Sequence, residues 1–433
     1  MITVIRTGEK TFDETFLRIK QRGKIFDKDV WAIVQDIVED VAKRGNEALF
    51  AYMAKFDGVI IDERTVEVSA EEIEVSLAMI AEDDLRVLKL AAKRIDKFHR
   101  QQNITGWLTS DAEGIELGQR VLPLARIGIY APGGRAAYPS TVLMAAIPAR
   151  IAGVEEIVLA TPSKDGKINP FIAAAAVIGG VHRIFKIGGA QAIAALAYGT
   201  ESVPPVDKIV GPGNAYVAAA KKMVYGRVAI DMIAGPSEVI VIADKTAAAA
   251  HVAADLLAQA EHDIMSSAVL LTPEEALAAG VAAELEIQLK TLSKRDVAEK
   301  SLRDFGALII TKNLEEAVSI ANGFAPEHLE LMIAAPKEML NKVKNAGAIF
   351  LGNNTPEVLG DYMAGPNHIL PTGGTARFSS PLGVYDFVKR TSIIHFSHDA
   401  LQKYGKETAR FADIEGFEAH SRSATLRITG KNS

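Results

Sequence analysis

The chain has 433 residues, 48% of them hydrophobic and 24% charged, which is enough for two to four domains with real cores at roughly 150 residues each. Its net charge of -6 and its scattered lysines and arginines leave no basic stripe that would follow a phosphate backbone, and no run of about 18 apolar residues predicts a membrane span. The absence of cysteine excludes disulfides, thiolate metal ligands and covalent catalysis through sulfur.

The N-terminal part is predicted to be mainly helical. The segment 29–45, DVWAIVQDIVEDVAKRG, repeats apolar residues at steps of three and four and ends at a glycine. Ser69 and Glu72 have the spacing of a capping box at the start of a second helix, and segment 83–98 continues the helical pattern. The first residues lack the charged start and apolar core of a secretory signal, so we expect a cytoplasmic protein.

From about residue 120 the sequence predicts alternating strands and helices. Short apolar runs broken by glycines, each followed by an alanine-rich helix, occur in RIGIYAPGG, EEIVLATP, RIFKIGGAQAIAALA and DKIVGPGNAYVAAAKKMV. A second series begins at GPSEVIVIAD and continues through SSAVLLTP, GALIIT, ELMIA and GAIFLG. The pattern predicts two α/β units of similar build in tandem, each with a mostly parallel sheet. The tail after about residue 382 has too little apolar material for its own core, so we expect it to pack on something else, such as a second subunit.

Two glycine turns are candidates for anion binding. GGAQ (188–191) and GPGN (211–214) both follow predicted strands and open helices, where backbone N–H groups favour a phosphate. Neither has the G-x-G-x-x-G spacing of a dinucleotide fingerprint, and the alternative is that these glycines only make tight turns. The polar Gln191 and Asn214 favour a ligand.

The segment FAPEHLEL (324–331) sets a carboxylic acid beside an imidazole at Glu327 and His328. One interpretation is a working acid and base or a metal site. The alternative is a pair of solvated side chains at the start of a helix, because Pro326 fits a first helical turn.

Gln259 and His262 are three residues apart on a predicted helix, so we expect them to share a face that could hold a metal. A histidine with a glutamine is a weaker metal signature than H-E-x-x-H, and a surface histidine is the alternative. Without thiolates, any metal would be bound by nitrogen and oxygen, which suits zinc or manganese.

The polar loop 360–383 offers Asp361 and His368 as metal or substrate groups, since a loop of this length in a compact domain usually carries function. Asp361 could instead be a turn residue or a helix cap. In the tail, EGFEAH offers Glu415, Glu418 and His420, although such acids usually form a solvated helix face.

Four motifs of the chain, in order, resemble those of histidinol dehydrogenases: AGPSEVIVIADKTAAAAHVAADLLAQAEHD, FAPEHLEL, GDYMAGPNHILPTGG and EAHSRSATLR. The resemblance covers nearly the whole chain. It implies a zinc- and NAD-dependent enzyme that oxidises L-histidinol through L-histidinal to L-histidine, the last step of histidine biosynthesis, reducing two molecules of NAD. It also implies a homodimer in which Glu415 and His420 cross the interface.

Site residues follow from the same resemblance, position by position. The zinc ligands, for one ion per subunit, would be Gln259, His262, Asp361 and His420. The proton carriers would be Glu327 and His328. NAD would contact Tyr130, Gln191 and Asn214. The substrate would contact Ser237, Glu415 and His368, together with His328 and the four zinc ligands.

The expected fold is α/β, with two tandem incomplete Rossmann-like units, a small helical N-terminal arm and a C-terminal extension. The arm would span 1–26. The first α/β domain would combine 27–129 with 239–381 and carry the metal and catalytic residues. The second, 130–238, would bind NAD, and 382–433 would pack on the partner subunit.

These assignments give a mechanistic hypothesis. His328 would remove the hydroxyl proton, since an unperturbed imidazole pKa near 6.5 suits a base near neutrality. Because no thiol is present, water must add to the aldehyde, and Glu327 would activate it.

Three alternative functions are retained. A paralogue could oxidise a different alcohol, such as a hydroxysulfonate. A zinc hydrolase could use Glu327 as base without NAD, and failure to reduce NAD would favour it. A non-catalytic binding protein could keep the same scaffold, although it would be expected to lose some site residues.

Overall fold

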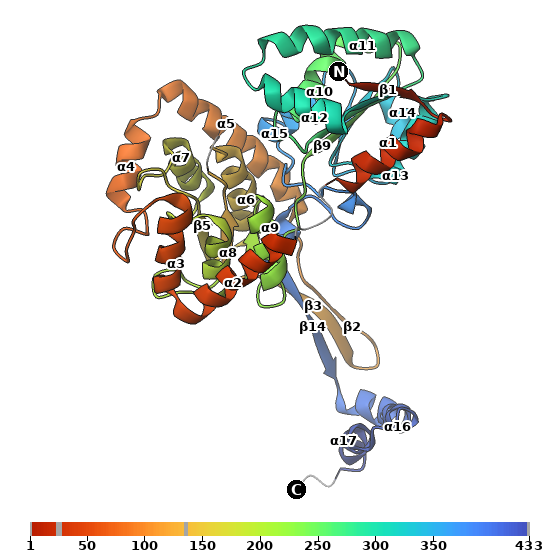
Figure 1. Cartoon of the computed structure of the whole chain (residues 1–433). Coiled ribbons are helices and arrows are strands. Elements are labelled where there is room, and N and C mark those ends of the chain that lie inside the picture. The colour runs from red at the N-terminus through yellow and green to blue at the C-terminus, as the bar shows by residue number, and fades with distance from the viewer. Residues whose placement is uncertain (1, 23–27, 134–136, 431–433) are drawn as a thin grey trace. The chain divides into compact units, whose positions relative to one another are not determined.

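The computed structural model describes residues 2–22, 28–133 and 137–430. The chain divides into two compact units (Figure 1). Unit 1 comprises residues 1–102 and 124–387, and unit 2 comprises residues 103–123 and 388–433. Within the described ranges, no helix is long and apolar enough to cross a membrane.

One part of unit 1 is built on a six-stranded parallel sheet. In spatial order its strands are β1 (Thr3–Arg6), β11 (Ala307–Ile310), β10 (Ser267–Thr272), β9 (Glu238–Ala243), β12 (His328–Met332) and β13 (Ala348–Leu351). Strands β9 to β13 therefore follow the order 3-2-1-4-5 of a doubly wound fold, with β1 added at the edge. Strands β9, β10 and β12 are buried along their whole length, as expected for parallel strands covered on both faces.

Helices cover both faces of this sheet (Figure 1). One face packs against α10 (Ala249–Ala260), α11 (Glu275–Gln288) and α12 (Arg295–Phe305). The other face packs against α1 (Lys10–Gln21), α13 (Leu314–Phe324) and α14 (Pro336–Leu340). A short helix, α15 (Glu357–Tyr362), follows β13 and contacts α10.

The other part of unit 1 repeats this plan with a five-stranded parallel sheet. Its strands, in spatial order, are β6 (Arg183–Phe185), β5 (Glu156–Ala160), β4 (Arg126–Tyr130), β7 (Lys208–Val210) and β8 (Ala229–Ile230), again the order 3-2-1-4-5. One face is covered by α2 (Lys28–Arg44), α3 (Asn46–Tyr52), α8 (Gly189–Tyr198) and α9 (Ala215–Val224). The other is covered by α5 (Glu82–His99), α6 (Pro139–Ala152) and α7 (Pro170–Gly179), with α4 (Ala70–Ala78) against α7. The predicted fold class, two tandem incomplete Rossmann-like units, is confirmed.

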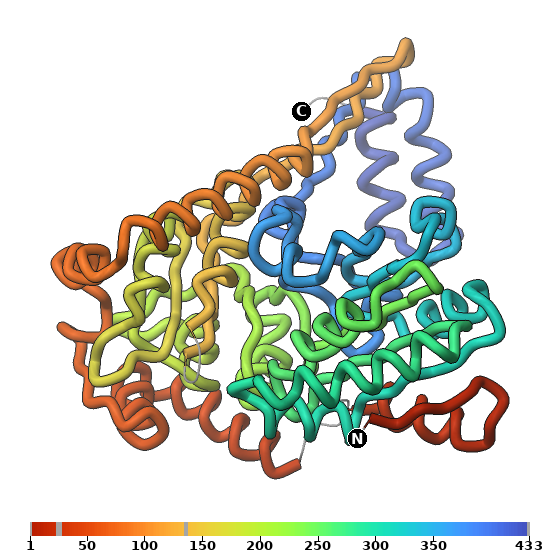
Figure 2. The backbone as a smooth tube through the Cα atoms, turned by 90° about the horizontal axis from the view of Figure 1, so that it is seen from above, coloured from red at the N-terminus to blue at the C-terminus, as the bar shows by residue number. Residues whose placement is uncertain are grey.

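The structure divides the N-terminal residues differently from the predicted boundaries. The expected helical arm, 1–26, contains α1, but it also supplies β1 to the six-stranded sheet. Helices α2 to α5 were expected to join 239–381, yet they pack around the five-stranded sheet, as Figure 2 also shows for the orange helices beside the yellow and green segments. An amphipathic helix specifies that one face is buried, but its periodicity does not specify which sheet it covers.

Unit 2 combines two distant segments of the chain. Strands β2 (Trp107–Ser110), β3 (Ile115–Pro123) and β14 (Val388–Phe396) form an antiparallel sheet in the order β14-β3-β2, followed by helices α16 (His398–Ile414) and α17 (Glu418–Ile428). The hairpin β2–β3 thus belongs with the C-terminal extension rather than with the first α/β domain. Phe411 and Leu426 are 63% and 64% exposed, so unit 2 presents apolar side chains without a partner in the single chain.

Candidate active site

Glu327 and His328 lie at the beginning of β12, where the register with β9 sets them beside Ser237 and Glu238. Helix α13 ends at Phe324, and Ala325 adopts a left-handed conformation with φ of 57°. Pro326 therefore follows a helix and does not begin one. The alternative in which Glu327 and His328 lie in the first turn of a helix is wrong, because β12 begins at His328. His328 pairs with Val239 across the parallel strands, so Glu327 stands opposite Glu238.

Glu327 is a buried carboxyl group, 6% exposed. Its Oε2 accepts a hydrogen bond from the Glu238 backbone N–H at 3.0 Å. Burial, followed by the negative charge of Glu238, raises the pKa of Glu327 well above its ordinary range, and the hydrogen bond from the Ser237 side chain opposes this shift. The carboxylate, once ionised, is a stronger base than an exposed glutamate.

His328 has one ring nitrogen engaged by the backbone. Its Nδ1 lies 3.3 Å from the carbonyl oxygen of Glu238, which assigns the proton to Nδ1 and leaves the lone pair on Nε2. Nε2 lies 4.0 Å from Asp361 Oδ1. Burial lowers the pKa of His328 to about 4, so the imidazole is uncharged near pH 7. An unperturbed histidine would be partly protonated at that pH.

Asp361 and His368 approach His328 from α15 and the loop that follows it. His368 Nδ1 lies 3.0 Å from the Asp361 backbone oxygen, and its Nε2 lies 3.4 Å from the hydroxyl of Thr141 on α6. Burial lowers the pKa of His368 as well. The predicted polar loop thus places both of its candidate residues beside His328.

Gln259 and His262 come from the end of α10. The helix stops at Ala260, so His262 lies in the turn just beyond it and not on the helical face that we expected. Gln259 is fully buried, and neither atom of its amide group has a hydrogen-bond partner. After burial, the charge of His262 is among the lesser causes that lower the pKa values of His328 and His368.

Over residues 2–22, 28–133 and 137–430, no group of three or more histidine, aspartate or glutamate side chains is close enough to hold a metal ion. The predicted ligand set has only two such residues in unit 1, His262 and Asp361, because Gln259 is an amide and His420 belongs to unit 2. The unpaired amide of Gln259 nevertheless fits a metal ligand, since a buried polar group without a partner is costly.

A cavity of about 1420 Å³ lies at the carboxyl ends of the five-stranded sheet. Its lining includes the three residues expected to contact NAD, Tyr130, Gln191 and Asn214. Tyr130 ends β4, and the two glycine turns follow β6 and β7, so all three residues meet at the edge where doubly wound folds bind ligands. Glu327 and His328, by contrast, lie at the amino ends of the six-stranded sheet.

The two glycine turns have structural roles within this cavity. Asn214 caps α9, its Oδ1 accepting from the backbone N–H groups of Tyr216 and Val217, each at 3.1 Å. Gly211 has φ of 111°, and a Cβ there would collide with the backbone oxygen of Tyr130. The side-chain N–H of Gln191 donates to Asp57 at 3.2 Å. The turns are therefore tight for structural reasons, and they also line a cavity, while the interpretation that they bind a ligand stays a prediction.

In unit 2, Glu415 and His420 line one groove of about 870 Å³ between α16 and α17. Glu415 caps the end of α16, and His420 lies in the first turns of α17, with its ring 5.1 Å from the ring of Phe417. Glu418, the third tail candidate, begins α17 and forms an exposed ion pair with Arg422. It therefore lies on a solvent-exposed helix face, which was the alternative for these acids.

Several polar residues of the site were missed in the sequence. Glu238, Glu330 and Glu357 are almost completely buried, at 1%, 1% and 0% exposure. A signal was available for the first two, because each is a charged residue in an otherwise apolar strand, EVIVIA and HLELM. Arg22 and Thr141 had no such signal, since their partners are remote in sequence.

Comparisons with known proteins identify the family of this chain. The sequence model described as histidinol dehydrogenase matches residues 20–428. A histidinol dehydrogenase of Syntrophotalea carbinolica is 50% identical over 428 residues, covering 99% of each chain, and one of Geobacter sulfurreducens is 51% identical over 421 residues, covering 97% of this chain and 98% of the relative. The crystal structure of histidinol dehydrogenase from Elizabethkingia anophelis has a TM-score of 0.92 at 37% identity and covers 100% of this chain and 99% of its own. The resemblance seen in the four motifs is confirmed: this chain belongs to the histidinol dehydrogenase family.

Proposed function

We propose that the chain oxidises L-histidinol by way of L-histidinal to L-histidine, the last step of histidine biosynthesis, as a zinc- and NAD-dependent cytoplasmic homodimer. The observation that carries the proposal is the buried pair of proton acceptors at Glu327 and His328, in a family member that has no cysteine. A four-electron oxidation of a primary alcohol needs two such proton transfers in one site.

His328 is the base of the alcohol step. Its Nδ1–H is directed to the carbonyl of Glu238, so Nε2 accepts the proton of the substrate hydroxyl. Because burial lowers the pKa of His328 to about 4, the ring is neutral and ready to accept a proton throughout the neutral range. The departing hydroxyl proton is thereby removed as the carbinol carbon is oxidised.

Glu327 activates water for the aldehyde step. An aldehyde must form a tetrahedral adduct before it can lose a second hydride, and with no thiol in the chain the adduct is the hydrate. The Glu327 carboxylate accepts a proton from the adding water, and its raised pKa strengthens it as a base. His328 gives the proton that it took in the alcohol step to the aldehyde oxygen as water adds, and its neutral ring then removes a proton from the hydrate as the acid forms.

Zinc is supported by the donor set. The unpaired buried amide of Gln259, the ring of His262 and the carboxylate of Asp361 come from neighbouring elements of unit 1, and His420 would complete the set from the partner subunit. These nitrogen and oxygen donors suit zinc. When bound, zinc would supply a positive centre that fixes the substrate nitrogens and so orients the carbinol carbon. Ser237, His368 and Glu415 are the further substrate contacts in this proposal.

NAD is supported by the cavity at the five-stranded sheet. Tyr130, Gln191 and Asn214 line a space of about 1420 Å³ beside two helix N-termini, which favour phosphate. The Tyr130 hydroxyl accepts a hydrogen bond from the Gly189 N–H at 3.1 Å and so fixes the turn at the N-terminus of α8. When bound, NAD would accept the hydride of each oxidation step.

The first test is the stoichiometry of NADH formed per L-histidinol consumed by the zinc-loaded protein. Two NADH per histidinol are expected, and Glu327→Gln and His328→Asn should each lower the rate by orders of magnitude while the circular dichroism spectrum is kept. The two variants should differ in the alcohol step measured with the aldehyde trapped, because His328 acts in both steps whereas Glu327 acts only in the aldehyde step.

Absence of NADH from histidinol, with zinc bound and the protein folded, would refute the substrate assignment. Other alcohols would then be tested, followed by hydrolysis. An unchanged rate in both variants would refute the roles of the pair.

A further inference from the structure

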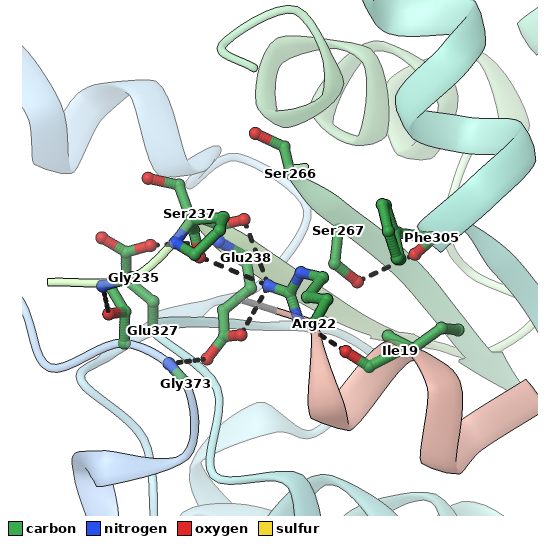
Figure 3. Close-up of polar contacts among 12 residues, drawn as sticks. Ile19, Arg22, Gly235, Ser237, Glu238, Ser266, Ser267, Phe305, Glu327 and Gly373 are labelled. Atoms are coloured by element: carbon green, nitrogen blue, oxygen red, sulfur yellow. Dashed lines mark hydrogen bonds and ion pairs between the residues drawn. The ribbon is translucent and has the colours of Figure 1, made fainter. Parts of the chain in front are cut away.

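Arg22 is a buried arginine whose partners include Glu238, the neighbour of Glu327 across β9 and β12. Its side chain is 2% exposed, and it forms an ion pair with Glu238, itself 1% exposed, at 2.6 Å. Figure 3 shows the guanidinium reaching from the end of α1 to the carboxylate of Glu238, with Glu327 on the far side of the Glu238 backbone. We call these two residues the Arg22–Glu238 pair.

The guanidinium also binds backbone oxygens on both sides of the site. Its Nη2 donates to the carbonyls of Pro236 and Ser237, at 3.4 and 3.3 Å, and its Nε donates to Met265 at 3.0 Å. Its Cζ lies 5.8 Å from the ring centroid of Phe324, three residues before Glu327. One side chain therefore contacts the segment before β9 and the end of α13 that precedes β12.

Glu238 extends the same network to the polar loop. Its second carboxylate oxygen accepts from the Gly373 N–H at 3.1 Å, and next to this contact the Thr372 hydroxyl accepts from the Gly235 N–H at 2.6 Å. The segment 235–238 is thus fixed at both of its ends, by Arg22 on one side and by the loop on the other.

This segment supplies both donors to Glu327. The Glu238 N–H donates to Oε2 at 3.0 Å, and the Ser237 side chain also hydrogen-bonds the carboxyl group. The carbonyl that orients His328 is that of Glu238, which is also held in β9 by its pairing with Ser267 of β10. Loss of the buried pair would therefore disturb Glu327 more than His328.

We infer that Arg22 and Glu238 are a positioning pair for Glu327, holding segment 235–238 so that its donors fix the water-activating carboxylate. This rests on the proposed role of Glu327 in the aldehyde step. Breaking a buried ion pair is costly mainly because it leaves one charge unpaired, whereas neutral residues of similar shape in place of both partners can be tolerated. The double variant Arg22→Met/Glu238→Gln therefore removes the network without leaving a buried charge.

The experiment measures the two steps separately in the full-length zinc-loaded enzyme with NAD. The aldehyde step is followed as NADH from L-histidinal, and the alcohol step as NADH from L-histidinol with semicarbazide to trap the aldehyde. The double variant is compared with Arg22→Lys, which keeps the charge, and with Arg18→Met, the same loss of charge at an exposed position of α1. Circular dichroism and the thermal midpoint establish folding, and Arg22→Gln/Glu238→Gln, which also leaves no unpaired buried charge, serves if the first double variant does not fold.

For the double variant we expect at least a tenfold fall in kcat for the aldehyde step, with KM for the aldehyde and kcat for the alcohol step within about threefold. Arg22→Lys should recover most of the lost kcat, and Arg18→Met should leave both steps unchanged. Equal losses in both steps, or no loss in either, would overturn the positioning role.

Glu327→Gln distinguishes a failure of the positioning role of the Arg22–Glu238 pair from a failure of the proposed role of Glu327. If it abolishes the aldehyde step while the double variant does not, only the inference about the Arg22–Glu238 pair fails. If Glu327→Gln leaves the aldehyde step intact, the proposed role of Glu327 fails, and the inference with it.

Discussion

Two buried carboxyl groups, Asp255 on α10 and Glu330 on β12, are expected to make the protein less stable as the pH rises. Their exposures are 8% and 1%. Burial raises the pKa of Asp255 from 3.8 to about 6, and burial together with the charge of Asp255 raises the pKa of Glu330 well above its ordinary range. The carboxyl of Glu330 hydrogen-bonds Asp255, so the folded pair retains a proton at neutral pH.

The direction follows from proton binding in the two states. A carboxyl group with a higher pKa in the folded protein binds its proton more tightly there, so its stabilising contribution is complete at low pH and is lost as the pH rises through the folded-state pKa. For Asp255 the window runs from 3.8 to about 6, and at 1.36 kcal/mol per unit the loss is about 3 kcal/mol.

Asp255→Asn removes this titration and keeps the size of the side chain. Between about pH 4.5 and pH 7.5, the free energy of unfolding of the variant relative to the parent should rise by about 2 kcal/mol. Urea unfolding followed by circular dichroism measures this difference, provided the slope with urea is unchanged. Asp36→Asn, the same substitution at an exposed position of α2, is the matched control for the chemical change. A constant difference for Asp255→Asn would refute the reasoning.

Three further variants test the cofactor and metal assignments. Gly211→Ala should weaken NAD binding at least tenfold by isothermal titration, since its Cβ would collide with the Tyr130 backbone oxygen. The control Gly226→Ala is also at positive φ, but the space around its Cβ is open, so it should bind NAD normally. Equal affinities in the two variants would contradict the assignment. Tyr130→Phe removes the acceptor of the Gly189 N–H and should cost about 1–2 kcal/mol of NAD affinity, whereas an unchanged dissociation constant would exclude a role for that hydroxyl. Gln259→Met should lower the amount of bound zinc, measured by atomic emission after dialysis. The thermal midpoint of the metal-free protein should stay unchanged or rise, because a buried amide without a hydrogen-bond partner is removed. Full zinc occupancy would exclude Gln259 as a ligand.

Local patterns predicted the secondary structure well. The capping box at Ser69 and Glu72 is present with both of its hydrogen bonds, because cap chemistry depends on residues only three apart. The apolar runs before the glycine turns are strands, and their alternation with alanine-rich helices indicated parallel sheets. Pro326 was ambiguous, since a proline can follow a helix as readily as it opens one.

The candidate site was predicted in part. The polar residues of FAPEH and of the 360–383 loop do come together in unit 1, because polar side chains gathered where glycine and proline interrupt apolar runs usually line a site. The position of His262 beyond the end of α10 was missed, since helix ends are the least certain feature of a periodic pattern.

The sequence by itself determined the fold class and the family, because periodicity, turn residues and the four motifs are local properties of the chain. Only the tertiary structure decided that helices α2 to α5 belong to the five-stranded sheet and that Arg22 pairs with Glu238, 216 residues away. Only burial decided that the pKa of Glu327 rises while that of His328 falls, since desolvation depends on which elements pack around a group. These features arise from contacts between segments remote in sequence, and such contacts leave no periodic trace in the chain.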